Sequence, residues 1–232
     1  NCRMRKLVAG AADLILGATC PGCGHPGLGI CRACASRTRV QLVHRSVAGL
    51  PAVAGGAYSG PLREFLLSFK VGQQAGHERL LSYLLAAAIV ELIGEASAVV
   101  LVPVPPSRRS LRERDRDLVL ELARGSAKQL QRLGVSARVV RALRLVRQPA
   151  DQHDLDQASR QANLAGAMGV RRQVGPQSRV VVVDDILTSG ATLSEAVRAL
   201  AEGDGASILG SAIVAAVKSL SGPENTSPIS SG

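Results

Sequence analysis

The stretch from residue 179 to residue 196, RVVVVDDILTSGATLSEA, is the strongest constraint on the fold. It begins with a run of four valines that is apolar on both faces and too short for a helix. Such a run is typical of a central strand in a parallel sheet. Two acids and a polar loop follow, and then apolar residues recur at helical spacing. The sequence therefore predicts an α/β fold, in which helices flank a parallel sheet.

The polar loop after the valine run has the residue types of a phosphate site. In α/β sheets, ligands bind outside the carboxyl ends of the strands. Unpaired N–H groups at the start of a helix hold phosphate well. Thr188, Ser189 and Thr192 add hydroxyl donors, and Gly190 lets a ligand come close to the backbone. We therefore expect an anionic group to bind at this loop.

Asp184 and Asp185 precede the loop and would repel a phosphate. Their natural partners are sugar hydroxyls, or a Mg²⁺ ion shared with a phosphorylated ligand. Together with the loop, they predict a sugar phosphate as the ligand. The chain has no Gly-Lys-Ser/Thr phosphate loop and no G-x-G-x-x-G fingerprint. The alternative interpretation is a buried strand whose end happens to be acidic, followed by an ordinary helix N-cap.

The segment VVVVDDILTSGAT resembles the 5-phosphoribosyl-1-pyrophosphate (PRPP) loop of type I phosphoribosyltransferases. In that family the acids contact the ribose 2- and 3-hydroxyls, and the loop holds the 5-phosphate. The resemblance implies a type I phosphoribosyltransferase fold and a catalytic role for the two acids. The PRPP-binding residues that it implies are Asp184, Asp185, Ile186, Leu187, Thr188, Ser189, Gly190, Ala191 and Thr192.

Four cysteines form two C-x-x-C pairs separated by seven residues: Cys20, Cys23, Cys31 and Cys34. This spacing fits four thiolates around a tetrahedral Zn²⁺. The alternatives are disulfides, which a cytosolic chain disfavours, and a redox C-x-x-C, which would not need a second copy. Four sulfur ligands leave no open position, so we expect a structural zinc ion.

A second apolar run, residues 98–104, predicts another central strand, and a rigid basic turn follows it. Arginines supply forked donors for a pyrophosphate held beside the PRPP loop. The alternative is a solvated basic start of a helix. The residues of this expected pyrophosphate loop are Pro105, Pro106, Ser107, Arg108 and Arg109. Further arginines continue the basic cluster at positions 112, 114 and 116.

Periodicity predicts helices from Leu62 to about Gly72, over about 76–93 and over about 117–133. On the second of these, His77 and Tyr83 are interpreted as surface groups. A strand is predicted over 139–145 and another over 207–217. The polar stretch between residues 147 and 168 has the composition of a lid over an active site.

Charge and composition favour anionic partners. The net charge is +10, which suits pyrophosphate, nucleotides or nucleic acid. Two Phe, two Tyr and no Trp are fewer aromatics than a nucleic-acid surface built by base stacking would need. The alternative is that a high content of Arg and Ala reflects genome composition.

Domain boundaries follow from changes in composition. The start of the chain imitates a signal peptide, but Asp13 interrupts its apolar run, and a helix is the better interpretation. We therefore expect a cytoplasmic protein without a membrane span. The predicted divisions are an N-terminal helix (1–17), a Cys₄ zinc module (18–38), a phosphoribosyltransferase-like domain (39–218) and a disordered tail (219–232).

The order of several motifs resembles the competence protein F (ComF) family over nearly the whole chain. The motifs are the cysteine pairs, Y-S-G-P-L-R-E-F with F-K, V-P-V-P-P-S-R-R, Q-x-x-L-x-x-x-x-R-x-x-N-L-x-G and the PRPP loop. The resemblance implies that a mobile lid around Gln152, Arg160 and Asn163 covers the site. The chain departs from the family where R-G-F-N-Q is replaced by residues 114–118, and where Met168 replaces an aromatic residue.

The resemblance leaves two functions to distinguish. One is an enzyme that transfers phosphoribosyl from PRPP to an unknown nitrogen acceptor, with Mg²⁺ and arginines stabilising the pyrophosphate. The other is a PRPP-responsive module with weak turnover that binds single-stranded DNA and DNA-uptake proteins. Domains of this kind often pair, so a homodimer is a further expectation.

Overall fold

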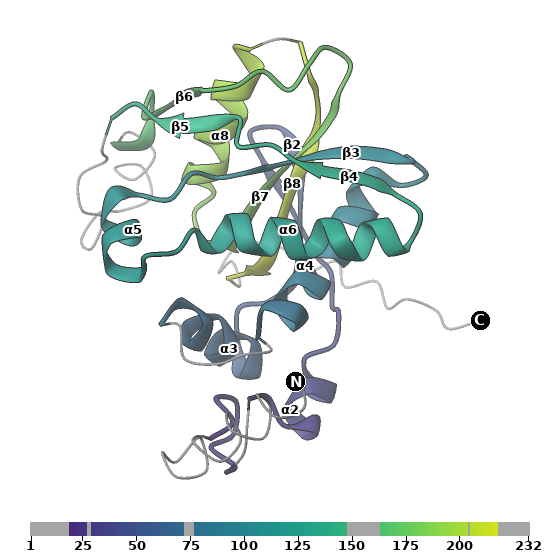
Figure 1. Cartoon of the computed structure of the whole chain (residues 1–232), viewed down its shortest axis with the longest axis vertical. Coiled ribbons are helices and arrows are strands. Elements are labelled where there is room, and N and C mark those ends of the chain that lie inside the picture. Colours follow the sequence, from purple (N-terminus) through teal and green to yellow (C-terminus); the bar gives the residue numbers. More distant parts are fainter. Residues whose placement is uncertain (1–18, 27–28, 72–76, 148–162, 204, 218–232) are drawn as a thin grey trace, which may run out of the picture.

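The computed structural model of the chain describes residues 19–26, 29–71, 77–147, 163–203 and 205–217. Its main sheet has six strands in the order β1-β2-β8-β7-β3-β4 (Figure 1). Their bounds are β1 Val43–Val47, β2 Leu50–Ala57, β3 Ala98–Pro103, β4 Ser136–Val139, β7 Arg179–Leu187 and β8 Ser207–Ala216. Every neighbouring pair is parallel except β1 with β2, which is an antiparallel hairpin at one edge.

Strand β7 is central, as the valine run predicts. It pairs with β8 on one side and β3 on the other. Val181 and Val183 join the core on one face of the sheet, whereas Val180 and Val182 join the core on the other face. All four valines are fully buried, because side chains alternate along a strand and helices cover both faces.

Helices α4 (His77–Ile93) and α6 (Leu118–Arg132) cover one face, and α8 (Ala191–Ala201) covers the other (Figure 1). Gly125 lets α6 approach α4 closely, because a Cβ there would lie 2.1 Å from the hydroxyl oxygen of Ser82. In turn, the hydroxyl of Ser126 donates to the carbonyl of Ser82 at 2.9 Å. The bounds of α4 and α6 confirm the helices predicted over 76–93 and 117–133.

The strand predicted over 139–145 is wrong as a single element. Only its ends are strand: Val139 is the last residue of β4, in the main sheet, and the other end is β5 (Leu143–Leu145), which forms a small antiparallel pair with β6 (Met168–Val170). The chain turns between them, where the N–H of Ala142 donates to the carbonyl of Val140 at 2.9 Å. Because Ala142 is buried at this turn, the apolar pattern of the sequence continues where the chain changes direction.

The cysteine segment and α2 (Arg32–Arg37) lie beyond α3 (Gly60–Lys70), at the lower end of the molecule in Figure 1. Gly22 fits against Phe65 of α3, since a Cβ on this glycine would lie 3.0 Å from the phenyl ring. Phe65 also stacks on His77, with the ring centroids 5.8 Å apart.

His77 is therefore fully buried, and its interpretation as a surface group is wrong. It begins α4 at the place where α3 packs against that helix. Tyr83, by contrast, is 55% exposed, as expected.

Three sequence predictions lie outside the described residues: the N-terminal helix over 1–17, the tail over 219–232 and most of the lid, 148–162. Within the described part of the chain, every helix is too short or too polar to cross a membrane.

Candidate functional site

The predicted PRPP loop connects β7 to α8. β7 continues through both acids to Leu187, so the carboxylates lie on the strand rather than after it. Residues 188–190 then lead into α8, for which Gly190 is the N-cap. Gly190 has a φ of 79°, in the left-handed region that glycine adopts readily. The loop thus presents the N-terminus of an 11-residue helix beside two carboxylates.

Asp184 is the buried member of the acid pair, with 9% of its surface exposed. One of its carboxylate oxygens accepts a hydrogen bond from the N–H of Asp185 at 2.8 Å. Burial, together with the negative charge of Asp185, raises the pKa of Asp184 to about 8. A cation or hydroxyl donors at this carboxylate would compensate for the solvation that it has lost.

Lys70, the last residue of α3, lies against the second acid. Its ammonium is 2.7 Å from Oδ2 of Asp185, and both side chains are mostly shielded from solvent. Sequence reasoning missed this residue, because a lysine in the last turn of a helix is also explained by the helix dipole. The F-K pair in the ComF-like motif was the signal that could have identified it.

The expected pyrophosphate loop lies beside the end of β7. Residue 103 of β3 pairs with Val183, and the N–H of Val104 donates to the Val183 carbonyl at 2.9 Å. Ser107 then caps the short helix α5 (Arg108–Arg114) by accepting from the N–H of Ser110 at 3.0 Å. Because β3 and β7 are parallel neighbours, the turn and the PRPP loop follow carboxyl ends at the same edge of the sheet.

The arginines of this turn and of the segment that follows it differ in their contacts. The Arg109 guanidinium donates to Glu113 at 2.7 Å, on an exposed surface. Arg116 stacks over the ring of Phe69 at 5.2 Å and pairs with Glu121. A cavity of about 330 Å³ next to them is lined by Lys70, Val71, Glu113, Arg114 and Arg116. Three cationic side chains thus line this cavity, and one of them, Lys70, also contacts the acid pair.

Of the expected lid residues, Gln152 and Arg160 lie outside the described part, and Asn163 is described. The guanidinium of Arg147 donates to the carbonyls of Asn163 and Ala165, both at 2.9 Å. Met168, which replaces a family aromatic, is a buried core residue of β6. Its N–H donates to Glu195 of α8 at 2.8 Å.

The four cysteines come together as the spacing predicts. Their sulfur atoms lie within 4.8 Å of one another, and none of them is in a disulfide. The sulfurs of Cys23 and Cys31 are 3.7 Å apart. A tetrahedral zinc with Zn–S bonds of about 2.3 Å places its sulfurs about 3.8 Å apart. The cluster therefore fits a structural zinc ion.

Backbone N–H groups support the same cluster. Those of Cys31 and Cys34 point at the sulfurs of Cys20 and Cys31, each at 3.4 Å. Such contacts stabilise thiolate charge and orient metal ligands.

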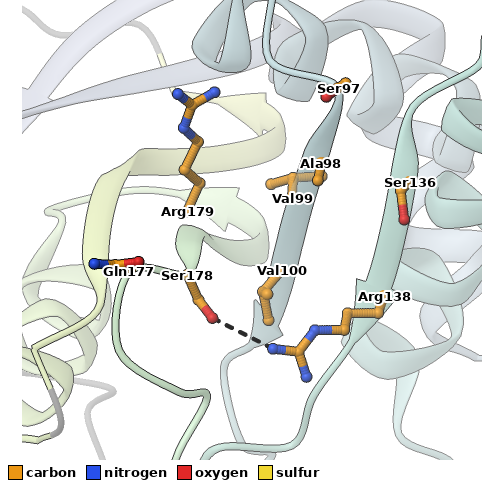
Figure 2. A pocket seen from close by; sticks show the side chains of 9 residues that line it. All are labelled: Ser97, Ala98, Val99, Val100, Ser136, Arg138, Gln177, Ser178 and Arg179. Atoms are coloured by element: carbon orange, nitrogen blue, oxygen red, sulfur yellow. Dashed lines mark hydrogen bonds between the residues drawn. The ribbon is translucent and has the colours of Figure 1, made fainter.

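A different cavity, of about 430 Å³, lies at the amino ends of β3, β4 and β7 (Figure 2). Arg138 at its rim donates to the carbonyl of Val174 at 2.6 Å and to the hydroxyl of Ser178 at 3.4 Å. Because ligands of parallel sheets bind at the carboxyl ends, this cavity is separate from the candidate site.

Comparison with known proteins agrees with this geometry. Residues 121–231, just under half of the chain, match the family model of the phosphoribosyl transferase domain. That range contains β7, the PRPP loop and α8. No curated protein was found to match the chain. The mostly parallel sheet flanked by helices is thus the fold of a phosphoribosyl transferase domain, preceded by a four-cysteine cluster that could hold zinc.

Proposed function

We propose that this protein is a PRPP-binding phosphoribosyltransferase of the ComF type, which transfers phosphoribosyl to a nitrogen acceptor with Mg²⁺. The observation that carries the proposal is the junction of β7 and α8. There a buried carboxylate, a second carboxylate paired with Lys70 and a helix N-terminus share one strand end.

Each part of this junction has a role in binding PRPP. Residues 188–192 hold the 5-phosphate through backbone N–H groups and hydroxyls, because the helix start carries partial positive charge. Asp184 and Asp185 accept hydrogen bonds from the ribose 2- and 3-hydroxyls. These donors compensate for the burial of Asp184, which water does not reach freely.

The residues present also fit Mg²⁺. Carboxylate oxygens are hard donors of the kind that this ion prefers, and Asp184 and Asp185 would supply them. Asp185 is already paired with Lys70, and a cation at Asp184 would offset the cost of burying the charge of that carboxylate. When bound, the ion would offset the charge that develops on the departing pyrophosphate.

The proposed reaction is a displacement at C1 of the ribose. The acceptor nitrogen forms a bond to C1, the bond from C1 to the pyrophosphate oxygen breaks, and that oxygen keeps the electron pair. The acceptor then releases a proton to solvent. The turn over 105–109, with Lys70, Arg114 and Arg116 near it, stabilises the leaving pyrophosphate by charge.

We also propose that the Cys₄ segment and the phosphoribosyltransferase-like domain are separate parts of the chain, as the sequence predicts. The Cys₄ segment serves as a structural staple against α3, since Gly22 packs on Phe65. Cytoplasmic location, single-stranded DNA binding and pairing into a homodimer stay predictions from the resemblance.

A calorimetric titration with PRPP, with and without Mg²⁺, tests the proposal. We expect saturable, Mg²⁺-dependent binding that is lost in the double variant Asp184→Asn/Asp185→Asn. The matched control is Glu91→Gln/Glu202→Gln, which removes the same charge from exposed ion pairs elsewhere. Failure of the parent protein to bind PRPP would exclude the transferase function. If binding is present, release of pyrophosphate with nucleobases and ammonia identifies the acceptor class.

A further inference from the structure

A second cationic cavity, of about 470 Å³, lies beside the edge strand β4 and plays no part in the proposed reaction. Four arginines from three segments line it. Arg124 comes from α6, Arg141 follows β4, and Arg171 and Arg172 follow β6. None of its lining residues belongs to the PRPP loop or to the cavity beside Lys70.

The backbone fixes this convergence. The carbonyl of Ala142 accepts hydrogen bonds from the N–H groups of Arg171 and Arg172, at 2.6 and 3.2 Å. Ala142 directly follows Arg141, so three of the arginines are attached to one hydrogen-bonded junction. They are therefore brought together by the fold, although they are distant in sequence and their side chains are exposed.

Acids near the cavity do not neutralise it. Asp117 faces it, with a carboxylate oxygen 3.6 Å from the guanidinium of Arg141, and its other oxygen caps α6. Glu121, on the next turn, pairs with Arg116 instead. Among the described residues, this single acid against four guanidiniums leaves a strongly positive site. A guanidinium group can donate two parallel hydrogen bonds to phosphate oxygens, so a phosphate chain is the ligand that fits this site best.

The rest of the lining is apolar and consists of Leu120, Val139 and Val140. Leu120 and Val140 are buried and Val139 is partly exposed, so a flat base would pack mainly on Val139, whereas an inorganic anion would make no polar contact with these side chains. The volume also lies within the range of about 300–1,000 Å³ that is typical of small-molecule sites. These properties favour a free nucleotide over the extended backbone of a nucleic acid, which would need a continuous groove.

The cavity in Figure 2 is a useful contrast. It too contains arginines, but Arg138 there donates to Val174 and Ser178 within the protein. Its lining contains two arginines, whose guanidiniums point away from each other in Figure 2, against four arginines in the cavity beside β4.

We propose that the cavity lined by Arg124, Arg141, Arg171 and Arg172 binds a nucleoside di- or triphosphate, at a site separate from the PRPP loop. The phosphates contact the guanidiniums, and the base packs on the apolar floor. This inference does not depend on the proposed transferase activity.

Calorimetric titration of the full chain with ATP tests the site. We expect saturable binding that is tighter than the binding of tripolyphosphate, which keeps the phosphates but lacks the base. The variant Arg171→Gln/Arg172→Gln should weaken ATP binding by about tenfold or more. The single variant Arg124→Gln should weaken it to a smaller degree. The control Arg144→Gln/Arg132→Gln removes equal charge outside the cavity and should change the affinity less than about twofold.

A second variant separates this site from the proposed active site. Thr188→Val/Thr192→Val removes hydroxyls from the PRPP loop and should leave ATP binding unchanged. Three outcomes would overturn the proposal: no binding of ATP, an equal loss in the charge-matched control, or binding of single-stranded oligodeoxythymidine without binding of ATP. The last result would assign the arginines to a nucleic-acid surface.

Discussion

The ammonium of Lys70 lies 2.7 Å from a carboxylate oxygen of Asp185 and connects the end of α3 to the end of β7. The two residues are 115 positions apart in the sequence, yet their side chains are only 23% and 18% exposed. The lysine offsets part of the repulsion between the adjacent acids. It therefore fixes the position of the Asp185 carboxylate before any metal or sugar binds.

The variant Lys70→Met should lower the free energy of unfolding by about 1–3 kcal/mol, because Asp185 then keeps a poorly solvated charge without its partner. Mg²⁺ should partly restore this loss, since the cation takes the place of the ammonium. Melting temperatures with and without Mg²⁺ measure both effects. Lys128→Met, an exposed lysine on α6, is the control and should show neither. Equal Mg²⁺ responses in the two variants would contradict this role for Lys70.

Much of the acid site could be predicted from the sequence, because its signals are local. Four valines, two acids and a Thr/Ser/Gly loop are contiguous, and the order alone places them at a strand end. Lys70 could not be placed in the same way. Its partner is set by how α3 docks on the sheet, and this depends on packing between distant segments.

Loss of the metal should destabilise the N-terminal module. We expect one zinc ion per chain by atomic absorption, and Cys23→Ser should abolish it because three sulfurs no longer close the tetrahedron. The melting temperature should fall in parallel, as it should after chelation. Cys2→Ser is the matched control and should keep the metal, since Cys2 lies outside the two C-x-x-C pairs. Full zinc content in Cys23→Ser would refute the four-sulfur site.

His77 shows why other parts of the fold were not predictable. On the sequence alone it is a polar residue at the start of a helix, and such residues usually face water. The structure buries it against Phe65, and its ring nitrogens have no hydrogen-bond partner among the described residues. Similarly, the apolar periodicity of residues 139–145 continues through a turn, because both strands around it face the core.

Burial lowers the pKa of His77, so the folded protein takes up its proton less readily than the unfolded chain. Stability should therefore fall as the pH drops below about 6.5, where the unfolded state begins to bind the extra proton. His77→Phe retains a ring against Phe65 and removes the unpaired nitrogens. It should raise the free energy of unfolding by about 1–3 kcal/mol at neutral pH and flatten its decline in acid. Urea unfolding at about pH 5, 6 and 7.5, values on both sides of the unfolded pKa, measures both effects. An unchanged acid slope in His77→Phe would assign the pH dependence to other groups.

Gly190→Ala should damage both stability and phosphate binding. The φ of 79° places this residue in the left-handed region, and a Cβ there would lie 3.3 Å from a methyl group of Val47. We expect a loss of about 1–2 kcal/mol in the free energy of unfolding, because L-residues are strained in that region. PRPP affinity should fall further than stability alone explains, since relieving the strain reorients the N–H groups at the start of α8. Gly134→Ala has a similar φ of 83° on an open surface and serves as the control. Gly134→Ala should lose stability to a similar extent and keep its PRPP affinity. An equal loss of affinity in both variants would contradict a role for this loop in phosphate binding.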